Sequence, residues 1–180
     1  MTMNIKFPLI LDGAMGTQLQ KRGLEHGVCP EKWITDNPDA AFAVQKAYVD
    51  AGSEVIYTPT FGANCAGLEK YGVFNKVEEY NVEIAAISKK AAEGRALVAG
   101  DISSTGGMLY PMGDMSFEDL YEIYLEQAEA LEKAGVFICE EQNEKRLITK
   151  QDFYNDNTLS PQNQYFSGLL LKKAKMCYII

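Results

Sequence analysis

A carboxylate and a glycine-containing turn stand together near the N-terminus. Asp12 follows the apolar run Leu9–Leu11, and a helix is expected to begin at Thr17. The turn between them consists of Gly13, Ala14, Met15 and Gly16. A carboxylate attracts an ammonium group, and the free N–H groups at a helix N-terminus attract an anion. The segment is therefore predicted to bind a small zwitterionic amino acid, with an ordinary tight turn as the alternative. It is not a phosphate loop, because it lacks both the Gly-Lys-Ser/Thr ending and a third glycine.

Two later loops carry groups of the same kind. Thr58 and Thr60 can offer hydroxyls to a ligand, and Phe61 can supply an apolar wall. The alternative is that these residues only shape the turn. Asp101 stands at the end of another apolar run and precedes the Gly-rich loop 103–107. We therefore count Asp101 with the candidate binding residues.

These loops belong to a repeated strand–loop–helix pattern. The expected strands are residues 9–11, 54–58, 96–102 and 136–139. The expected helices are residues 17–20, 38–51, 77–93 and 116–134, with a short one through Leu68. Such alternation predicts parallel strands joined by right-handed crossovers, as in a TIM barrel or a doubly wound sheet. In both folds, ligand groups gather at the carboxyl ends of the strands.

Local signals mark two helix starts. Asn37 followed by Pro38 suits an N-cap with proline in the first helical position. Ser116 and Asp119 have the spacing of a capping box. Residues 21–35 are mixed and contain glycine, so we expect a loop there.

Composition excludes several classes of protein. The chain has 180 residues, of which 47% are hydrophobic, so it is long enough for one domain with a core. The net charge of −8 argues against a nucleic-acid partner. No apolar run is long enough to span a membrane, which favours a cytoplasmic protein. The four cysteines form no CxxC pair, and the single histidine, His26, is expected in a solvated loop.

The amino-acid composition changes near the C-terminus. Residues 143–180 are rich in Asn, Gln, Lys and Tyr, and contain neither an acid-ended strand nor a Gly-rich loop. We therefore divide the chain into a domain of residues 1–136 and a divergent tail of residues 137–180. A natural extension, a frameshifted sequence and a disordered segment are the alternatives for this tail.

Several short motifs occur in a fixed order between Leu9 and Val136. They are Leu-Asp-Gly-Ala-Met-Gly-Thr at 11–17, Ala-Gly-Ser-Glu-Val-Ile at 51–56, Thr-Pro-Thr-Phe-Gly-Ala-Asn at 58–64, Leu-Glu-Lys-Tyr-Gly at 68–72, Ala-Gly-Asp-Ile at 99–102 with Thr-Gly at 105–106, and Tyr-Pro-Met-Gly at 110–113. The ordered set resembles the homocysteine S-methyltransferase family, which includes the homocysteine-binding domain of cobalamin-dependent methionine synthase. The resemblance implies the N-terminal half of a TIM-type (β/α)8 barrel, about four βα units, followed by an atypical tail.

The resemblance also implies roles for residues of this chain. The N–H groups of Gly13, Ala14 and Met15 would meet the homocysteine carboxylate. A glutamate at the end of the fourth strand would meet the amino group; Glu140 and Glu141 lie near that place, and we assign Glu141. An exposed glutamate pair is the alternative.

In this family, three cysteine thiolates hold zinc, which binds the homocysteine sulfur as a thiolate. The methyl donor is methylcobalamin, S-methylmethionine or a betaine, so a corrinoid protein or domain is an implied partner. The usual Gly-x-Asn-Cys and Gly-Gly-Cys-Cys-Gly regions follow later strands and are missing from this sequence. Gly62-Ala63-Asn64-Cys65 spells the first motif after the wrong strand. We therefore assign no metal ligand and expect a truncated form that is inactive in methyl transfer.

Two other functions remain open at this stage. A half barrel could be a non-catalytic module that binds a small amino acid or a partner protein, and its open strand edges would favour self-association. A flavodoxin-like domain is the third possibility, although no phosphate loop of known type supports it. A methyltransferase would require zinc and thiols, whereas a binding module would require neither. Bound flavin would identify a flavodoxin-like domain.

Overall fold

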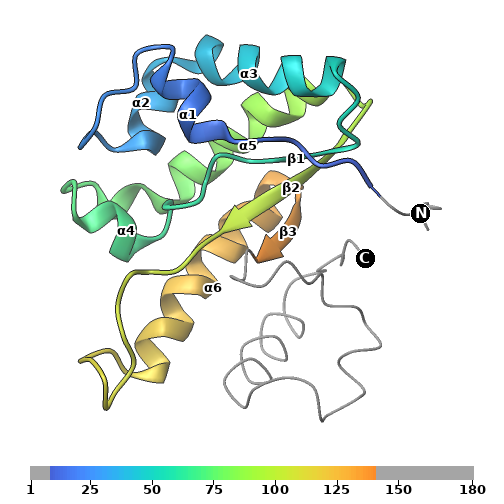
Figure 1. Ribbon diagram of the computed structural model, residues 1–180. Helices are drawn as coiled ribbons and strands as arrows, with labels where there is room; N and C mark the ends of the chain where they lie inside the picture. The colour runs from blue at the N-terminus through green and yellow to red at the C-terminus, as the bar shows by residue number, and fades with distance from the viewer. Residues whose placement is uncertain (1–8, 141–180) are drawn as a thin grey trace, which may run out of the picture.

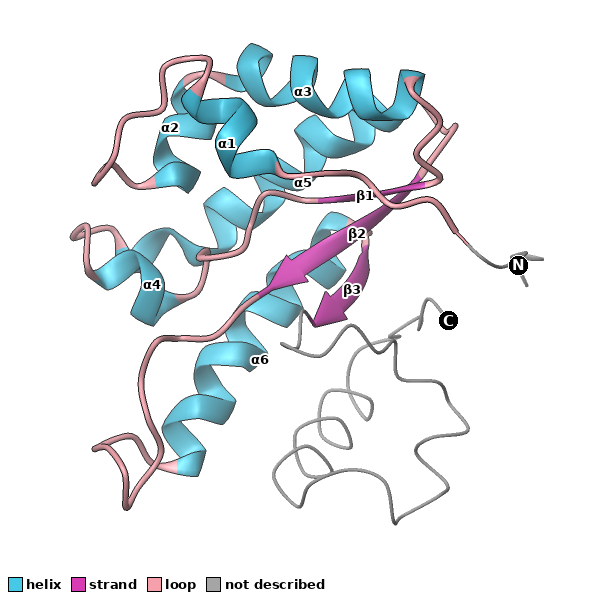
Figure 2. Ribbon diagram, viewed as in Figure 1, coloured by secondary structure: helices cyan, strands magenta, loops and turns pink. Residues whose placement is uncertain are grey.

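The computed structural model describes residues 9–140, which form a parallel sheet covered by helices (Figures 1 and 2). Its strands are β1 (Val55–Tyr57), β2 (Leu97–Ile102) and β3 (Phe137–Glu140). They lie in the order β1-β2-β3, and both pairs are parallel. The helices are α1 (Met15–Gln20), α2 (Pro30–Asp36), α3 (Pro38–Asp50), α4 (Cys65–Glu69), α5 (Val77–Ala92) and α6 (Phe117–Ala134), with a 3₁₀ turn η1 (Phe74–Lys76). The alternating α/β order and the parallel sheet predicted from the sequence are confirmed. A half barrel remains a prediction, because these strands form an open sheet.

The first expected strand is shorter than predicted. Leu11 forms only an isolated parallel bridge to Val55, and Leu9 and Ile10 have no strand assignment. Ile10 still supports the edge of β1, since its carbonyl accepts the N–H groups of Glu54 and Val55 at 2.7 and 3.2 Å. The apolar run therefore lies along the edge of β1 and delivers Asp12 to the carboxyl end of the sheet.

Helices α3, α5 and α6 cover one face of the sheet. The alternating positions Ile56 and Val98 contact residues of α3 and α5, and Ile102 contacts Leu131 of α6. Gly100 lies on the same face, where an added Cβ would be 2.9 Å from a methyl group of Leu131. A strand glycine thus allows α6 to approach the sheet closely. The opposite face carries a smaller cluster around the buried Val55 and Ala99.

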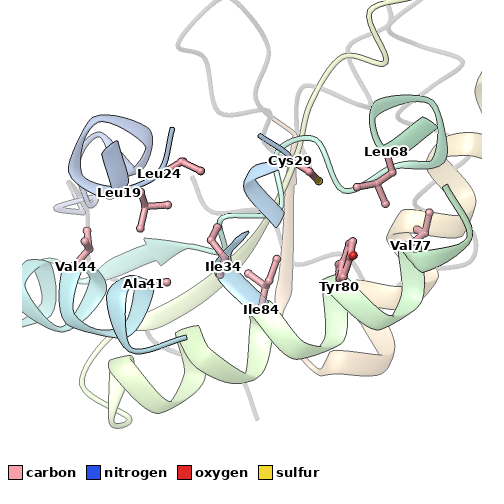
Figure 3. Packing of buried hydrophobic residues seen from close by; sticks show 10 residues of the cluster. All are labelled: Leu19, Leu24, Cys29, Ile34, Ala41, Val44, Leu68, Val77, Tyr80 and Ile84. Carbon is pink, nitrogen blue, oxygen red and sulfur yellow. The ribbon is translucent and has the colours of Figure 1, made fainter. Parts of the chain in front are cut away.

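The largest core cluster lies among α1 to α5, away from the strands (Figure 3). It is formed by Leu19, Leu24, Cys29, Ile34, Ala41, Val44, Leu68, Val77, Tyr80 and Ile84. These residues come from the short helices as well as from α3 and α5. The segments that precede β1 and follow it are therefore fixed by apolar burial.

The helix ends agree with most of the sequence signals. The capping box of α6 is present, with Ser116 Oγ accepting the Asp119 N–H at 3.0 Å. Pro38 starts α3 as expected, but the side chain of Asn37 donates to the Trp33 carbonyl instead of capping. The prediction of a loop over residues 21–35 is wrong, because α2 begins at Pro30. Proline in a first helical position was the signal that indicated this helix.

None of the helices in residues 9–140 combines the length and the apolar character that a membrane crossing requires.

Candidate active site

The carboxyl edge of the sheet brings the predicted loops together. Leu11 pairs with Val55, and β1 pairs with β2, so the residues after each segment meet at one end of parallel strands. Asp12, the turn that follows it, Thr58–Phe61 and Asp101 all lie at this end. Glu141 lies outside the described residues, and its role stays a prediction.

Asp12 is bonded to the end of β1 through both its backbone and its side chain. Its N–H donates to the Val55 carbonyl at 3.0 Å, and its Oδ2 accepts the Tyr57 N–H at 3.1 Å. Burial raises the pKa of Asp12 from its ordinary 3.8 to about 6, while the backbone hydrogen bonds oppose that rise. The carboxylate is therefore mostly ionised at neutral pH at a desolvation cost, which makes it a favourable partner for a cation.

The turn after Asp12 is held by a tyrosine of α3. The Tyr48 hydroxyl donates to the Ala14 carbonyl at 3.2 Å. A Cβ on Gly13 would lie 2.9 Å from ring and hydroxyl atoms of Tyr48, so a side chain at this position would displace the Tyr48 ring that bonds Ala14. Met15 begins α1 and packs against the main core. The N–H groups of the first helical turn have no partner within the helix and are the groups that can bind an anion.

Thr58 and Thr60 join two loops beneath the edge. Thr60 Oγ1 donates to the Asp101 carbonyl at 2.8 Å, and the Asp101 N–H donates to Thr58 Oγ1 at 3.1 Å. The two hydroxyl oxygens are 2.7 Å apart, and because the Thr60 proton is already donated, Thr58 is the donor between them. Both residues are fully buried. Their hydroxyls thus tie the loop after β1 to β2, and direct contact with a ligand stays a prediction.

Phe61 is the exposed member of this loop. Phe61 is 53% exposed, although its neighbour Thr60 is fully buried. Its carbonyl accepts the Ser103 hydroxyl at 2.6 Å, which connects it to the loop after β2. Phe61 is therefore exposed at the carboxyl edge, and its role as an apolar wall stays a prediction.

Residues 9–143 match the sequence profile described as Homocysteine S-methyltransferase, which is more than half of the 180 residues. The chain belongs to the homocysteine S-methyltransferase family. The resemblance stated from the sequence motifs is thereby confirmed.

Individual relatives come from several branches of this family. The chain is 30% identical over 115 residues to a methionine synthase of Mycobacterium tuberculosis, covering 59% of this chain and 9% of that protein. It is 33% identical over 134 residues to betaine–homocysteine S-methyltransferase 1 of Pongo abelii, covering 71% and 32%. The fold resembles part of the metallated homocysteine methyltransferase MmuM of Escherichia coli, with a TM-score of 0.65, 24% identity, and coverage of 76% of this chain and 54% of that one. The chain thus spans between a tenth and about half of these relatives.

Cys29 and Cys65 do not form a zinc site. Among residues 9–136, whose side chains the structure describes, no three His, Cys, Asp or Glu side chains are placed to hold a metal. Cys29 is buried and its Sγ lies 3.5 Å from Glu31 Oε2, while Cys65 begins α4. Burial raises the pKa of both thiols, which disfavours the thiolate that zinc requires. The described residues therefore do not fit zinc.

Sequence reasoning missed a set of buried polar side chains behind the site. Gln127, Asn81 and Gln45 are fully buried, and Glu31 is 4% exposed. Gln127 lies three residues after Tyr124 and four before Leu131, within the apolar stripe of α6. A polar residue inside an apolar stripe was the available signal. Its partners could not be read from the sequence, because they lie in distant loops.

Proposed function

We propose that residues 9–140 form the homocysteine-binding part of a homocysteine S-methyltransferase. The observation that carries this proposal is the partly buried Asp12 carboxylate, held at the carboxyl edge of the sheet beside a turn that begins a helix. A carboxylate next to backbone N–H donors matches the two charged groups of an α-amino acid. Membership of the family then indicates which amino acid is the ligand.

Each candidate residue has a role in this proposal. Asp12 and Glu141 receive the α-ammonium group, and the N–H groups of residues 13–15 receive the carboxylate. Phe61 lies against the aliphatic part of the ligand, and Asp101 borders the site. Thr58 and Thr60 fix the loops from below through the hydroxyl pair described above.

The methyl transfer itself is assigned to the whole enzyme. The reaction moves a methyl group from a donor to the homocysteine sulfur, which gives methionine and requires a thiolate nucleophile. The described residues hold no metal site that would stabilise this thiolate, so residues 9–140 are expected to bind homocysteine without methylating it. The relatives include methionine synthases and a betaine-dependent enzyme by name. The donor, including methylcobalamin on a corrinoid protein or domain, is therefore left open by the proposal.

The decisive test removes one charge from each side of the proposed ion pair. Binding of L-homocysteine is measured by calorimetry at pH 7.5 in a reducing buffer with chelator, for the unaltered chain and for Asp12→Asn. The same titrations use 4-mercaptobutyrate, which is homocysteine without its amino group. Asp114→Asn is the control, because it makes the same change at an exposed loop position.

We expect the unaltered chain to prefer homocysteine to 4-mercaptobutyrate by about tenfold or more, since charged hydrogen bonds contribute about 1.5–3 kcal/mol. Asp12→Asn should lose this preference, and Asp114→Asn should keep it. Equal preference in Asp12→Asn and in the unaltered chain would refute the role of Asp12. No binding of homocysteine by the unaltered chain would refute the proposed function.

A further inference from the structure

We propose that Glu31, Asn81 and Gln127 are positioning residues for the homocysteine site, a role that rests on the function proposed above. We call these three side chains the loop clamp. They come from three different helices, α2, α5 and α6, and all three reach the loop between β1 and α4. This loop carries the binding residues of the second strand end, so its position determines where those residues lie.

The clamp bonds successive backbone groups of the loop. Gln127 Nε2 donates to the Thr60 carbonyl at 2.8 Å, and Asn81 Nδ2 donates to the Ala63 carbonyl at 2.8 Å. The Gly62 N–H donates to Glu31 Oε1 at 2.9 Å. Over four residues, the loop therefore has three of its backbone groups fixed by side chains from the helix layer.

The clamp residues also depend on one another and on burial. Gln127 Nε2 lies 3.4 Å from Asn81 Oδ1, and Asn81 Nδ2 also donates to the Val77 carbonyl at 2.8 Å. A buried polar group that loses its hydrogen bond destabilises the protein, whereas apolar side chains can shift slightly and remain in contact. A shift of the loop would leave several buried donors and acceptors unpaired at once. The clamp therefore specifies one loop position.

The clamped residues lead directly to the ligand edge. Thr60, whose carbonyl binds Gln127, donates its hydroxyl to Asp101 and precedes the exposed Phe61. Gly62 and Ala63, which follow Phe61, are bonded in turn by Glu31 and Asn81. A change in the helix layer is thus transmitted to Phe61 and Asp101 through the loop backbone.

A matched glutamine separates positioning from general stability. Gln45 of α3 is fully buried like Gln127, its Nε2 donates to a backbone carbonyl at the same 2.8 Å, and its Oε1 likewise has no partner. The acceptor for Gln45 is the Tyr57 carbonyl in β1, and the Tyr57 N–H bonds Asp12, so Gln45→Met serves only to measure the stability lost with a buried glutamine hydrogen bond. Replacing either glutamine by methionine keeps the volume and removes a 2.8 Å hydrogen bond to a backbone carbonyl; in Gln127 it also removes the longer bond to Asn81 Oδ1.

The experiment measures melting temperature in Gln127→Met and Gln45→Met, and homocysteine affinity in Gln127→Met. We expect similar losses of melting temperature in both variants. Homocysteine affinity, measured well below the melting temperature, should fall about tenfold in Gln127→Met. Normal affinity in Gln127→Met would overturn the proposal.

A second pair of variants tests the clamp at Glu31, whose Oε1 accepts the Gly62 N–H. Glu31→Gln keeps an acceptor for the Gly62 N–H and should bind homocysteine within about threefold of the unaltered chain. Glu31→Met removes the acceptor and should bind about tenfold more weakly; equal affinities in the two would overturn the proposal. If the unaltered chain fails to bind homocysteine, the proposed function fails and the clamp proposal fails with it. Binding by the unaltered chain with unchanged clamp variants refutes the clamp proposal alone.

Discussion

Replacing Asp12 by asparagine is expected to make the protein more stable while it weakens ligand binding. The Asp12 carboxylate is partly buried, and burial raises its pKa from 3.8 to about 6. Folding therefore moves this charge into a less favourable environment. Asparagine retains an oxygen acceptor for the Tyr57 N–H, which Asp12 Oδ2 accepts at 3.1 Å. The substitution removes the desolvation cost and keeps the hydrogen bond.

The size of the effect follows from the pKa. A rise of about two units at about 1.4 kcal/mol per unit gives at most about 3 kcal/mol of stability gained by Asp12→Asn at pH 7. Because the folded pKa is raised, the folded chain binds more protons than the unfolded chain between pH 3.8 and about 6. Stability contributed by protonated Asp12 is present below pH 3.8 and is lost as pH rises to about 6. The advantage of Asp12→Asn should therefore grow over that window and be constant above it.

Urea unfolding of the two proteins at several pH values between 3.5 and 8 measures this difference. Subtracting the two free energies of unfolding removes the contributions of groups that both proteins share. Asp114→Asn, which makes the same change at an exposed loop position, is measured alongside as the control. The reasoning is refuted if Asp12→Asn is the less stable protein at pH 7, or if the difference does not change between pH 4 and pH 7.

The remaining predictions concern three glycines, of which Gly13 and Gly100 lie in close contact with another element and Gly16 does not. Gly13→Ala should destabilise the chain by about 1–3 kcal/mol, because its Cβ would be 2.9 Å from Tyr48. Gly16→Ala, which meets nothing within 4 Å and lies in α1, should instead stabilise it by about 0.5–1 kcal/mol; thermal unfolding of both variants gives the comparison. Gly100→Ala should destabilise by about 1–3 kcal/mol through contact with Leu131. A double-mutant cycle with Leu131→Ala should recover about 1 kcal/mol or more of that loss, and strict additivity would contradict the packing argument.

Elements with strong local signals were predictable from the sequence. The apolar run of β2 (Leu97–Ile102) and the capped, amphipathic α6 lie where their residues indicated. Helix α2 was missed because its seven residues show too little periodicity to outweigh the surrounding glycines. The shortened first strand was missed for another reason: whether an apolar run pairs fully depends on its neighbour in the sheet. Local propensity carries no information on that pairing.

The candidate site was predictable only in part. The position of Asp12 before a glycine turn indicated a carboxylate at the end of a strand, and the structure brings Asp12 to that end. The raised pKa of Asp12 could not be predicted, since burial depends on segments distant in sequence. The same limit applies to Thr58 and Thr60. Their residue types suggested ligand hydroxyls, whereas their hydrogen bonds to Asp101 depend on the β1–β2 pairing.

The front and the back of the site follow opposite physical rules. On the front, Asp12 retains a charge that folding disfavours, and such a group is stabilised when a ligand supplies the opposite charge. On the back, Glu31, Asn81 and Gln127 hold the loop with hydrogen bonds in a fully or almost fully buried layer. An unpaired carboxylate attracts a cationic ligand only if no group of the protein can move to pair with the carboxylate first. Asp12 is bonded to Val55 and Tyr57 of β1, and the clamp bonds the loop that follows the same strand, so under the proposed function the two features hold adjacent parts of a site for an ammonium-bearing ligand.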